Sequence, residues 1–293
     1  MGNIGFIGLG IMGRPMAKNL LAASGSLFVH DLNESAVADL VARGARAATP
    51  SEMAGLCDIV FLMLPNGPIV SSVLFEPCGV APNARPGLIV CDMSTTELAE
   101  ARSFAERLAA MGIDFMDAPV SGGEPKAVSG ELAIMAGGEE RCFTAVAPYL
   151  KAMGGQVNRV GGHGSGCAAK LINQILVHVT MAGVCEAYAL AEKLEVDLGT
   201  VYNAVGMGSA SSAMLHNRTG KILNRDFTSG AKVSIVHKDI KNVLAAGRDA
   251  DMPLPLTATV FDLLKAAKAA RFQDDDVTRL LTIYERLGGI AEQ

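Results

Sequence analysis

The alternation of two hydrophobic periods is the feature of this chain that most limits its fold. Over about the first 160 residues, short runs rich in Val, Ile, Leu and Phe alternate with segments whose apolar residues recur at helical spacing. This pattern is typical of βαβ units in a doubly wound parallel sheet. We expect strands at residues 3–8, 27–30, 58–64, 88–91, 114–118, 132–136 and 156–160.

A second region begins after the turn-rich stretch 161–166. Strand-like runs nearly vanish beyond it, and helical periodicity continues to the end of the chain. We therefore predict an α/β domain at residues 1–162, followed by an all-helical domain at residues 163–293. The helices of the second domain are expected near 168–194, 198–205, 209–223, 235–249, 255–269 and 277–287.

Composition narrows the class of protein. Half of the 293 residues are apolar, which is enough to build two cores. The net charge of -5 and the absence of a basic run argue against binding to nucleic acid, whose phosphates need clustered Lys and Arg. The six cysteines form no C-x-x-C pair and have no histidine at metal-ligand spacing, so we expect no metal site and buried thiols in a reducing cytoplasm.

Membrane association is not expected either. The first apolar residues belong to a strand and are not flanked by a charged segment and a cleavage site, so we predict no signal peptide. The most apolar later stretch, 175–194, is interrupted by His178, Glu186, Glu192 and Lys193. A membrane span needs about 20 predominantly apolar residues. We interpret the stretch as a buried core helix of a cytoplasmic protein.

A glycine loop lies between the first predicted strand and the first predicted helix. It reads Gly8-Leu-Gly10-Ile11-Met12-Gly13. Gly8 permits a tight turn, Gly10 lets the backbone approach a pyrophosphate, and Gly13 allows the helix to pack closely on the strand. The strand before it and the helix after it make this loop, with Ile11 and Met12, a predicted dinucleotide-binding site.

The second predicted strand is followed by Asp31, 21 residues beyond Gly10. A carboxylate at this position can accept hydrogen bonds from both hydroxyls of the adenosine ribose and would repel a 2′-phosphate. The next arginines in the chain are Arg43 and Arg46, well beyond the strand end. We therefore predict NAD as the cofactor, with NADP as the alternative.

Five further motifs follow the glycine loop in order. They are Met63-Leu-Pro-Asn66, Asp92-Met-Ser-Thr95, Asp117-Ala-Pro-Val-Ser-Gly-Gly123, Gly166-x-x-x-Lys170-x-x-Asn173 and His237-Lys-Asp239. With them the chain resembles the β-hydroxyacid dehydrogenase family over essentially its whole length. The stretch 122–127, Gly-Gly-Glu-Pro-Lys-Ala, is most similar to the tartronate semialdehyde (2-hydroxy-3-oxopropionate) reductases within that family. The resemblance implies a Rossmann domain, an all-α domain, and hydride transfer in a cleft between them.

Lys170 and Asn173 are the expected catalytic residues. By its pattern alone, Lys170 could equally be a lysine that extends along apolar surface to solvent. The resemblance implies catalysis, in which the ammonium donates a proton as hydride reaches the carbonyl carbon, and the neutral amine accepts one in the reverse direction. Asn173 would orient Lys170 or bind the substrate hydroxyl, whereas Gln174 could simply face neighbouring helices.

Substrate and cofactor contacts are also implied by the resemblance. Ser121, Gly122 and Gly123 follow a strand end, where a hydroxyl and backbone N–H groups can bind a substrate carboxylate. Taken alone, Ser-Gly-Gly is an ordinary loop. The remaining predicted cofactor contacts are Leu64 and Pro65 at the adenosine pocket, Thr95 near the nicotinamide, and Lys238 reaching the nicotinamide end of the cleft.

The two histidines and an acidic run are assigned structural roles instead. His178 and His237 have no neighbouring triad motif in the sequence, so both are predicted to be structural. The acidic run 274–276 is interpreted as a solvated helix start, where negative charge is favourable. The fallback interpretation of Lys238 is a surface lysine paired with Asp239.

The predicted activity is hydride transfer between NAD(H) and a small pair of a 3-hydroxy acid and its 3-oxo acid. The preferred pair is glycerate and tartronate semialdehyde. Alternatives are 3-hydroxyisobutyrate, succinic semialdehyde, sulfolactaldehyde and threonate. The chain is short for a 6-phosphogluconate dehydrogenase, and imine reductases lack a lysine at the position of Lys170. A non-catalytic dinucleotide-binding protein is the alternative from another class. The long apolar helix predicts a homodimer or homotetramer.

Overall fold

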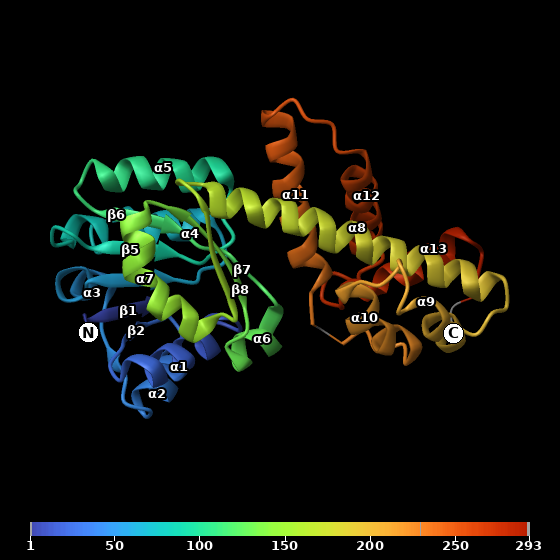
Figure 1. Ribbon diagram of the computed structural model, residues 1–293, viewed down its shortest axis with the longest axis horizontal. Coiled ribbons are helices and arrows are strands. Elements are labelled where there is room, and N and C mark those ends of the chain that lie inside the picture. The colour runs from blue at the N-terminus through green and yellow to red at the C-terminus, as the bar shows by residue number, and fades with distance from the viewer. Residues whose placement is uncertain (1, 229, 292–293) are drawn as a thin grey trace. The chain divides into compact units, whose positions relative to one another are not determined.

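The computed structural model describes residues 2–228 and 230–291, and the chain folds as two compact units. The first ends at Lys170 and the second begins at Leu171 (Figure 1). The first contains the predicted α/β region, and the second contains helices. The domain boundary predicted at residue 162 stays a prediction.

The first unit is built on a sheet whose described strands follow the order β3-β2-β1-β4-β5-β6-β8-β7, with β9 paired to β8. The strands are β1 (Ile4–Ile7), β2 (Phe28–His30), β3 (Arg46–Ala47), β4 (Ile59–Leu62), β5 (Ile89–Asp92), β6 (Asp114–Asp117), β7 (Val120–Ser121), β8 (Ala133–Gly138) and β9 (Gln156–Gly161). Strand β1 lies between β2 and β4, so the chain reverses its direction of travel across the sheet after β3. The predicted doubly wound, Rossmann-like sheet is confirmed.

Strand register brings the predicted motifs to one edge of the sheet. Ile7 is aligned with His30 on one side and with Leu62 on the other. Leu62 is aligned with Asp92, and Asp92 with Asp117. Because these strands are parallel, the loops that follow β1, β2, β4, β5 and β6 all leave from the same edge, where α/β sheets bind ligands.

The all-parallel expectation is wrong at the far side of the sheet. Strand β8 pairs antiparallel with both β6 and β7. No strand was expected at β3 or β7, because two residues are too few to show a hydrophobic period. An antiparallel neighbour needs no βαβ crossover, and the chain runs from β6 through β7 and the short helix α6 into β8.

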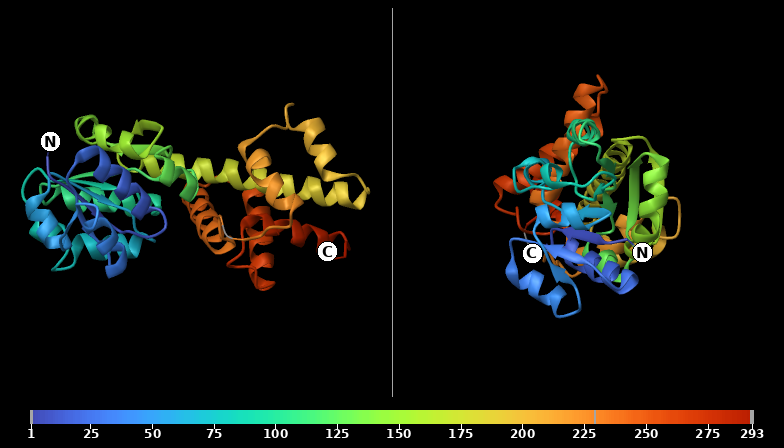
Figure 2. Two further views of the ribbon diagram at one scale, coloured as in Figure 1. Left: turned by 90° about the horizontal axis from the view of Figure 1, so that it is seen from below. Right: turned by 90° about the vertical axis from the view of Figure 1, so that its left-hand side faces the viewer.

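Helices cover both faces of this sheet (Figures 1 and 2). They are α1 (Gly13–Ser24), α2 (Glu34–Val41), α3 (Pro50–Leu56), α4 (Gly67–Phe75), η1 (Ala81–Asn83), α5 (Leu98–Ala109), α6 (Gly123–Ser129) and α7 (Glu140–Met153). Phe6 and Phe61 belong to one buried apolar cluster, whereas their strand neighbours Ile7, Val60 and Leu62 belong to another. Successive strand side chains point to opposite faces, which explains why these strands are apolar at every position.

Helix α8 (Ser165–Lys193) crosses from the first unit into the second. By length and composition alone it could span a membrane, and 44% of its most apolar window is buried. Core helices of soluble proteins pass the same test. Met181, Cys185 and Tyr188 on this helix lie in the buried core of the second unit, as the prediction of a core helix requires.

The rest of the second unit consists of helices. They are α9 (Leu198–Val205), α10 (Ala213–Leu223), α11 (Val233–Asp249), α12 (Pro255–Ala269), η2 (Val277–Arg279) and α13 (Leu280–Leu287). Each helix predicted after the long one is present. Helix α10 was expected from residue 209 but begins at Ala213, because the Ser212 side chain caps it by accepting a hydrogen bond from Leu215 N. The helix expected at 277–287 is divided into η2 and α13.

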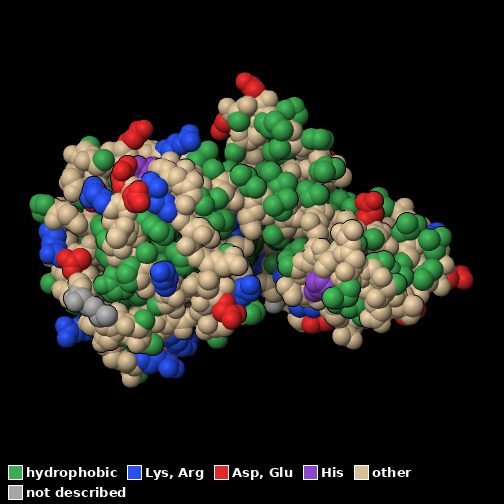
Figure 3. Space-filling view, in the orientation of Figure 1, with side chains coloured by type: hydrophobic (Ala, Val, Ile, Leu, Met, Phe, Trp, Pro, Cys, Tyr) green, Lys and Arg blue, Asp and Glu red, His purple; other side chains and the backbone are tan. Residues whose placement is uncertain are grey.

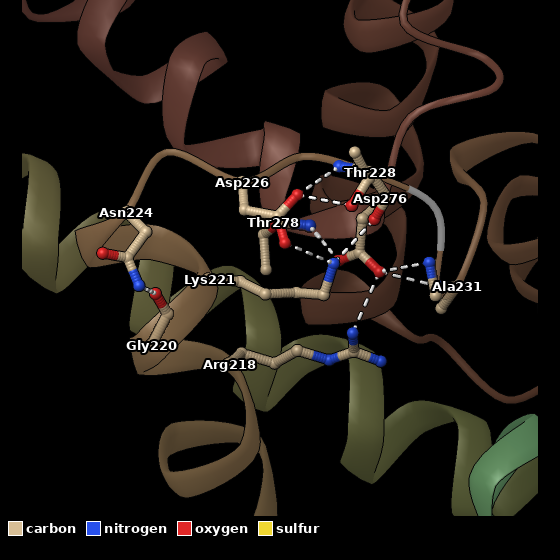
Figure 4. Close-up of polar contacts among 10 residues, drawn as sticks. Arg218, Gly220, Lys221, Asn224, Asp226, Thr228, Ala231, Asp276 and Thr278 are labelled. Carbon is tan, nitrogen blue, oxygen red and sulfur yellow. Dashed lines mark hydrogen bonds and ion pairs between the residues drawn. The ribbon is translucent and has the colours of Figure 1, made fainter.

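The interpretation of the acidic run 274–276 as a solvated helix start is wrong at one residue, Asp276. Asp274 is exposed, but Asp276 is fully buried. Its carboxylate accepts hydrogen bonds from Arg218 and from the backbone N–H groups of Ala231 and Thr278, among others (Figure 4). A buried charge is tolerated when it is paired and hydrogen-bonded, and these partners come from segments that the sequence does not place together.

Candidate functional site

The glycine loop has the geometry of a dinucleotide site. Gly8 adopts φ +100°, and a Cβ there would lie 2.3 Å from Met63 O. A Cβ at Gly13 would lie 1.9 Å from Gly8 O, so α1 packs against the loop as closely as glycine allows. Nothing lies within 4 Å of a Cβ built at Gly10. The protein itself therefore needs glycine at 8 and 13, whereas Gly10 leaves room for a ligand to approach the backbone.

A pocket of about 680 Å³ opens at this loop. Its lining residues are Leu9, Gly10, Ile11, Arg14, Pro15, Lys18, Asn19, Asn33, Ala36, Glu124 and Val128. The Ile11 side chain is 67% exposed, whereas Met12 packs against the core of the sheet. An exposed isoleucine beside bare glycine backbone suits a planar ligand with phosphates, so the residues present fit a dinucleotide.

Asp31 ties the end of β2 to the glycine loop. One carboxylate oxygen accepts from Leu9 N at 2.5 Å, and the other accepts from Asn33 N at 2.7 Å. The carboxylate therefore holds the loop in position, a role that the sequence did not reveal. Each carboxylate oxygen can accept a further hydrogen bond, so this arrangement is compatible with the predicted contact to ribose hydroxyls.

The pocket also contains cations that sequence reasoning missed. Arg14 and Lys18 line it, and both pair with Asp39, at 2.8 and 2.7 Å. Arg43 approaches the same carboxylate. Hydrogen bonds from these three cations hold the pKa of Asp39 well below its usual range. The four-residue spacing of 14 and 18 on one helix was the available signal.

The ends of β4 and β5 are joined by a buried serine. Leu64 N donates to Ser94 Oγ at 2.8 Å, and Ser94 N donates to Asp92 Oδ1 at 3.0 Å. Burial raises the pKa of Asp92 to about 6. Pro65 and Thr95, the predicted cofactor contacts beside these residues, are exposed and half-buried. Ser94 is thus a positioning residue for both predicted contact loops.

The start of α8 is anchored to the sheet by Asp117 at the end of β6. The buried Asp117 carboxylate accepts from the backbone N–H groups of Gly164 and Cys167, both at 2.8 Å. Burial raises the pKa of Asp117. A Cβ at Gly166 would lie 2.4 Å from Asp117 O, so only glycine permits this approach. The first turn of the helix is therefore held rigidly, with Lys170 one turn further along.

Lys170 is buried, with 8% of its surface exposed. Its Nζ donates to Val120 O at 2.8 Å, so the ammonium is directed to β7. Ser121 completes β7, and Gly122 and Gly123 follow at φ +139° and +69°, conformations that favour glycine. Lys170 Nζ therefore lies beside β7, the strand that leads into this turn, and its catalytic role stays a prediction.

Asn173 and Lys238 belong to the second unit, where a chain of polar contacts joins them. Asn173 Nδ2 donates to Gln174 Oε1 at 2.9 Å, and Gln174 Nε2 donates to Asp239 Oδ2 at 2.6 Å. Lys238 Nζ lies 3.5 Å from Asp239 Oδ1. Gln174, His178 and Asp239 are buried. The resemblance implied that Asn173 and Lys238 contact substrate and cofactor, which stays a prediction, and it did not indicate that these contacts join them.

The remaining candidates have structural surroundings. His237 stacks on Phe261 with ring centroids 4.7 Å apart, and burial lowers its pKa. His178 is buried beside Gln174. Within residues 2–228 and 230–291, no group of three or more His, Cys, Asp or Glu side chains is arranged to hold a metal ion. Among the cysteines, Cys78 is exposed and the others are buried.

Comparison with known families divides the chain in two. Residues 3–162 match the model described as the NAD-binding domain of 6-phosphogluconate dehydrogenase. Residues 164–284 match the model described as the NAD-binding domain of NADP-dependent 3-hydroxyisobutyrate dehydrogenase. Together the two matches span almost all of the described residues.

Individual relatives are similar over nearly their full length. The 2-(hydroxymethyl)glutarate dehydrogenase of Eubacterium barkeri is 36% identical over 290 residues, covering 98% of this chain and 96% of that protein. The 2-hydroxy-3-oxopropionate reductase of Escherichia coli (strain K12) is 36% identical over 266 residues, covering 91% of each. A crystal structure of 3-hydroxyisobutyrate dehydrogenase from Salmonella typhimurium, 35% identical, superposes with a TM-score of 0.85 over 96% of this chain and 99% of that one.

Proposed function

Because this chain belongs to the β-hydroxyacid dehydrogenase family of NAD(P)-dependent enzymes that act on CH–OH donors, we propose that it interconverts a small 3-hydroxy acid and its 3-oxo acid with Lys170 as the acid/base. The observation that carries this proposal is the buried Lys170 ammonium beside the turn Ser121-Gly122-Gly123. A lysine held there lies next to the groups suited to bind a carboxylate. A solvent-directed lysine would have no such neighbour.

In the proposed reaction the cofactor transfers the hydride and residues of the chain transfer the proton. The bound nicotinamide supplies or accepts the hydride. In reduction, Lys170 Nζ donates a proton to the substrate carbonyl oxygen as negative charge develops there, and in oxidation the neutral amine removes the hydroxyl proton. Val120 O orients Nζ through its hydrogen bond. Asp117 keeps α8, and therefore Lys170, at a constant position relative to the turn.

Carboxylate binding is assigned to the turn. The Ser121 hydroxyl and the backbone N–H groups of Gly122 and Gly123 are the donors, and the positive φ angles of both glycines shape the turn. Asn173 is assigned to the substrate hydroxyl. The cofactor contacts are the glycine loop, Asp31, Leu64, Pro65, Thr95 and Lys238. We propose NAD as the preferred cofactor, because the Asp31 carboxylate beside the glycine loop would repel a 2′-phosphate.

Tartronate semialdehyde is the proposed substrate, with glycerate as the product. The stretch Gly122-Gly-Glu-Pro-Lys-Ala127 supports it, as does the similarity to the Escherichia coli reductase. Relatives named for threonate, hydroxymethylglutarate and sulfolactaldehyde have comparable identities, so these acids, 3-hydroxyisobutyrate and succinic semialdehyde are the competing substrates.

We further propose a cytoplasmic homodimer or homotetramer. Helix α8 exposes Ile172, Leu176 and Leu190, and Leu194 directly follows the helix; each is 58% to 66% exposed. Hydrophobic side chains also gather on the visible face of the second unit (Figure 3). Exposed apolar side chains along one helix are typical of a protein–protein contact. Sedimentation of the wild type and of Leu176→Glu should show the oligomer and its loss.

The decisive experiment is the initial rate of NADH oxidation with tartronate semialdehyde, run beside other short aldehyde acids and repeated with NADPH. A preference for tartronate semialdehyde with NADH is expected. If another acid is reduced faster, the mechanism stands and the substrate assignment is wrong. If no aldehyde acid is reduced with either cofactor, the chain is a non-catalytic dinucleotide-binding protein.

A further inference from the structure

We propose that Asp39, on helix α2, helps to determine the choice between NAD and NADP. By pairing with Arg14 and Lys18, it withholds both cations from a phosphate on the adenosine ribose, so the site favours the cofactor that lacks this phosphate. Asp39 is a positioning residue, because it acts through the two cations. The inference rests on the proposed function, since it takes NAD as the preferred cofactor and Asp31 as the ribose contact.

The pocket at the glycine loop extends to the place where a 2′-phosphate would lie. Asp31 accepts hydrogen bonds from Leu9 N and Asn33 N, and Leu9 and Asn33 both line the pocket. The carboxylate proposed to bind the ribose hydroxyls is therefore at the wall of this pocket. A phosphate ester on the 2′-oxygen would bring about two negative charges into it.

Two cations reach the same pocket from α1. Arg14 and Lys18 line it, and their four-residue spacing places them on one face of the helix. Arginine and lysine are the side chains with which proteins bind phosphate. Among the described residues that line the pocket, Glu124 is the acidic one. By its lining residues alone, the pocket would therefore have a net positive charge and would suit NADP.

Asp39 engages both of these cations. Its Oδ2 accepts from Arg14 Nε at 2.8 Å and lies 2.7 Å from Lys18 Nζ, and its Oδ1 accepts from Arg43 Nε at 3.2 Å. These contacts, that of Lys18 above all, hold the pKa of Asp39 well below its usual range, so the carboxylate is ionised at any pH at which the enzyme would be assayed. A 2′-phosphate would have to compete with this carboxylate for both cations.

Stabilisation of the fold is the alternative role for these ion pairs. The side chains of Asp39, Arg14 and Lys18 are all partly exposed. Ion pairs in contact with solvent contribute little to the stability of a protein. Replacing Asp39 should therefore leave the fold intact and change the charge that a cofactor meets.

The kinetic test compares kcat/KM for NADH and NADPH with the same oxo acid. The wild type should favour NADH, and Asp39→Asn should lower this ratio about tenfold, the scale of one charge acting on a nearby dianion in water. The change should be a lower KM for NADPH, with kcat and the KM for NADH nearly unchanged. Asp39→Glu keeps a carboxylate and should keep the wild-type ratio. A wild type that favours NADPH would contradict the NAD preference and with it the proposal.

The change in Asp39→Asn should depend on the released cations. Adding Arg14→Gln and Lys18→Gln to Asp39→Asn should return the ratio to its wild-type value. The matched control is Asp262→Asn, which makes the same change in total charge at a side chain of the second unit that pairs with Lys265. Its ratio should equal that of the wild type. A folded Asp39→Asn enzyme with the wild-type ratio would overturn the proposal, as would a change that persists without both cations.

A second measurement is independent of turnover. In fluorescence titrations of the whole protein without an oxo acid, Asp39→Asn should bind NADPH about tenfold more tightly than the wild type does. This gain should shrink in about 1 M salt, where the screening length falls to about 3 Å. Equal NADPH affinities at low salt would refute the role of Asp39. If the wild type reduces no oxo acid, the proposed function fails, while these titrations still decide whether Asp39 selects the cofactor.

Discussion

The two units hold their candidate site residues in different ways. In the first unit, the groups sit in loops at one edge of the sheet, and backbone atoms supply most of their partners, as with Asp31 and Asp117. In the second unit, side chains satisfy one another, and Gln174 and Asp239 meet across 65 positions in the sequence. Groups held by backbone can be recognised from short motifs, whereas a network of side chains becomes visible only when helices pack.

The two units also differ in how well a buried aspartate is compensated by hydrogen-bond partners. Asp276 in the second unit has an arginine and several backbone N–H groups as partners. Asp92 in the first unit accepts from Ser94 through Oδ1, and its buried Oδ2 has no hydrogen-bond partner among the described residues. Asp92 is therefore the less well compensated charge. We expect the first unit to respond to pH at this residue.

The largest effect should follow the loss of the acid/base at the end of the first unit. Lys170→Ala should lower kcat by about 10³-fold, within the usual contribution of general acid–base catalysis. NADH affinity should change little, because the glycine loop is untouched. Steady-state rates and a fluorescence titration with NADH measure both quantities. The control is Lys193→Ala, an exposed lysine of the same helix that donates to Gly288 O. Retained turnover in Lys170→Ala would refute the assignment.

The next largest effect concerns Asp92 and pH. Its pKa is raised from 3.8 to about 6 in the folded protein, so the folded state binds the proton more tightly than the unfolded state. Stability from this group is full below about pH 4 and is lost as pH rises through about 6. Between these limits the wild type should lose on the order of 3 kcal/mol relative to Asp92→Asn. Urea unfolding at several pH values tests this.

The control for the pH experiment is an exposed carboxylate. Asp262→Asn removes the negative charge of a side chain that is 70% exposed and pairs with Lys265. Its stability curve should run parallel to that of the wild type. Parallel curves for Asp92→Asn as well would show that burial of Asp92 does not shift its proton binding.

A smaller effect separates two glycines of the same loop. Gly10→Ala adds a methyl group to open space, so the melting temperature should be unchanged, while NADH affinity should fall about tenfold because the backbone no longer approaches the pyrophosphate. Gly13→Ala should lower the melting temperature, since its Cβ would collide with Gly8 O. Calorimetry with and without NADH distinguishes the two. Equal affinity in Gly10→Ala would mean that the dinucleotide does not contact this residue.

The smallest effect tests the structural core of the second unit. Tyr188→Phe removes a hydroxyl that lies 2.6 Å from Thr219 Oγ1, while Thr219 keeps its bond to Leu215 O. The free energy of unfolding should fall by about 1 kcal/mol, the usual net value of one hydrogen bond. Turnover should be unaffected. A loss of activity in the folded variant would mean that the core around α8 also influences the site.

Several features could be predicted from the sequence because their causes are local. Gly8 and Gly13 were assigned their turn and packing roles from spacing alone, and the steric contacts of both are as expected. The helix at 255–269 was located with the ends that the structure has. Strand β7 was missed because two residues carry no period, and the solvated interpretation of Asp276 failed because its partners are distant in sequence.

The sequence by itself determined the alternation that builds the sheet, the helical second region and the family, since hydrophobic periods and contiguous motifs are encoded residue by residue. Only the tertiary structure decided the antiparallel pairing of β8, the anchoring of α8 by Asp117, and the chain of contacts from Asp239 through Gln174 to Asn173. Each of these depends on hydrogen-bond donors and acceptors that are far apart in sequence, and burial makes them satisfy one another.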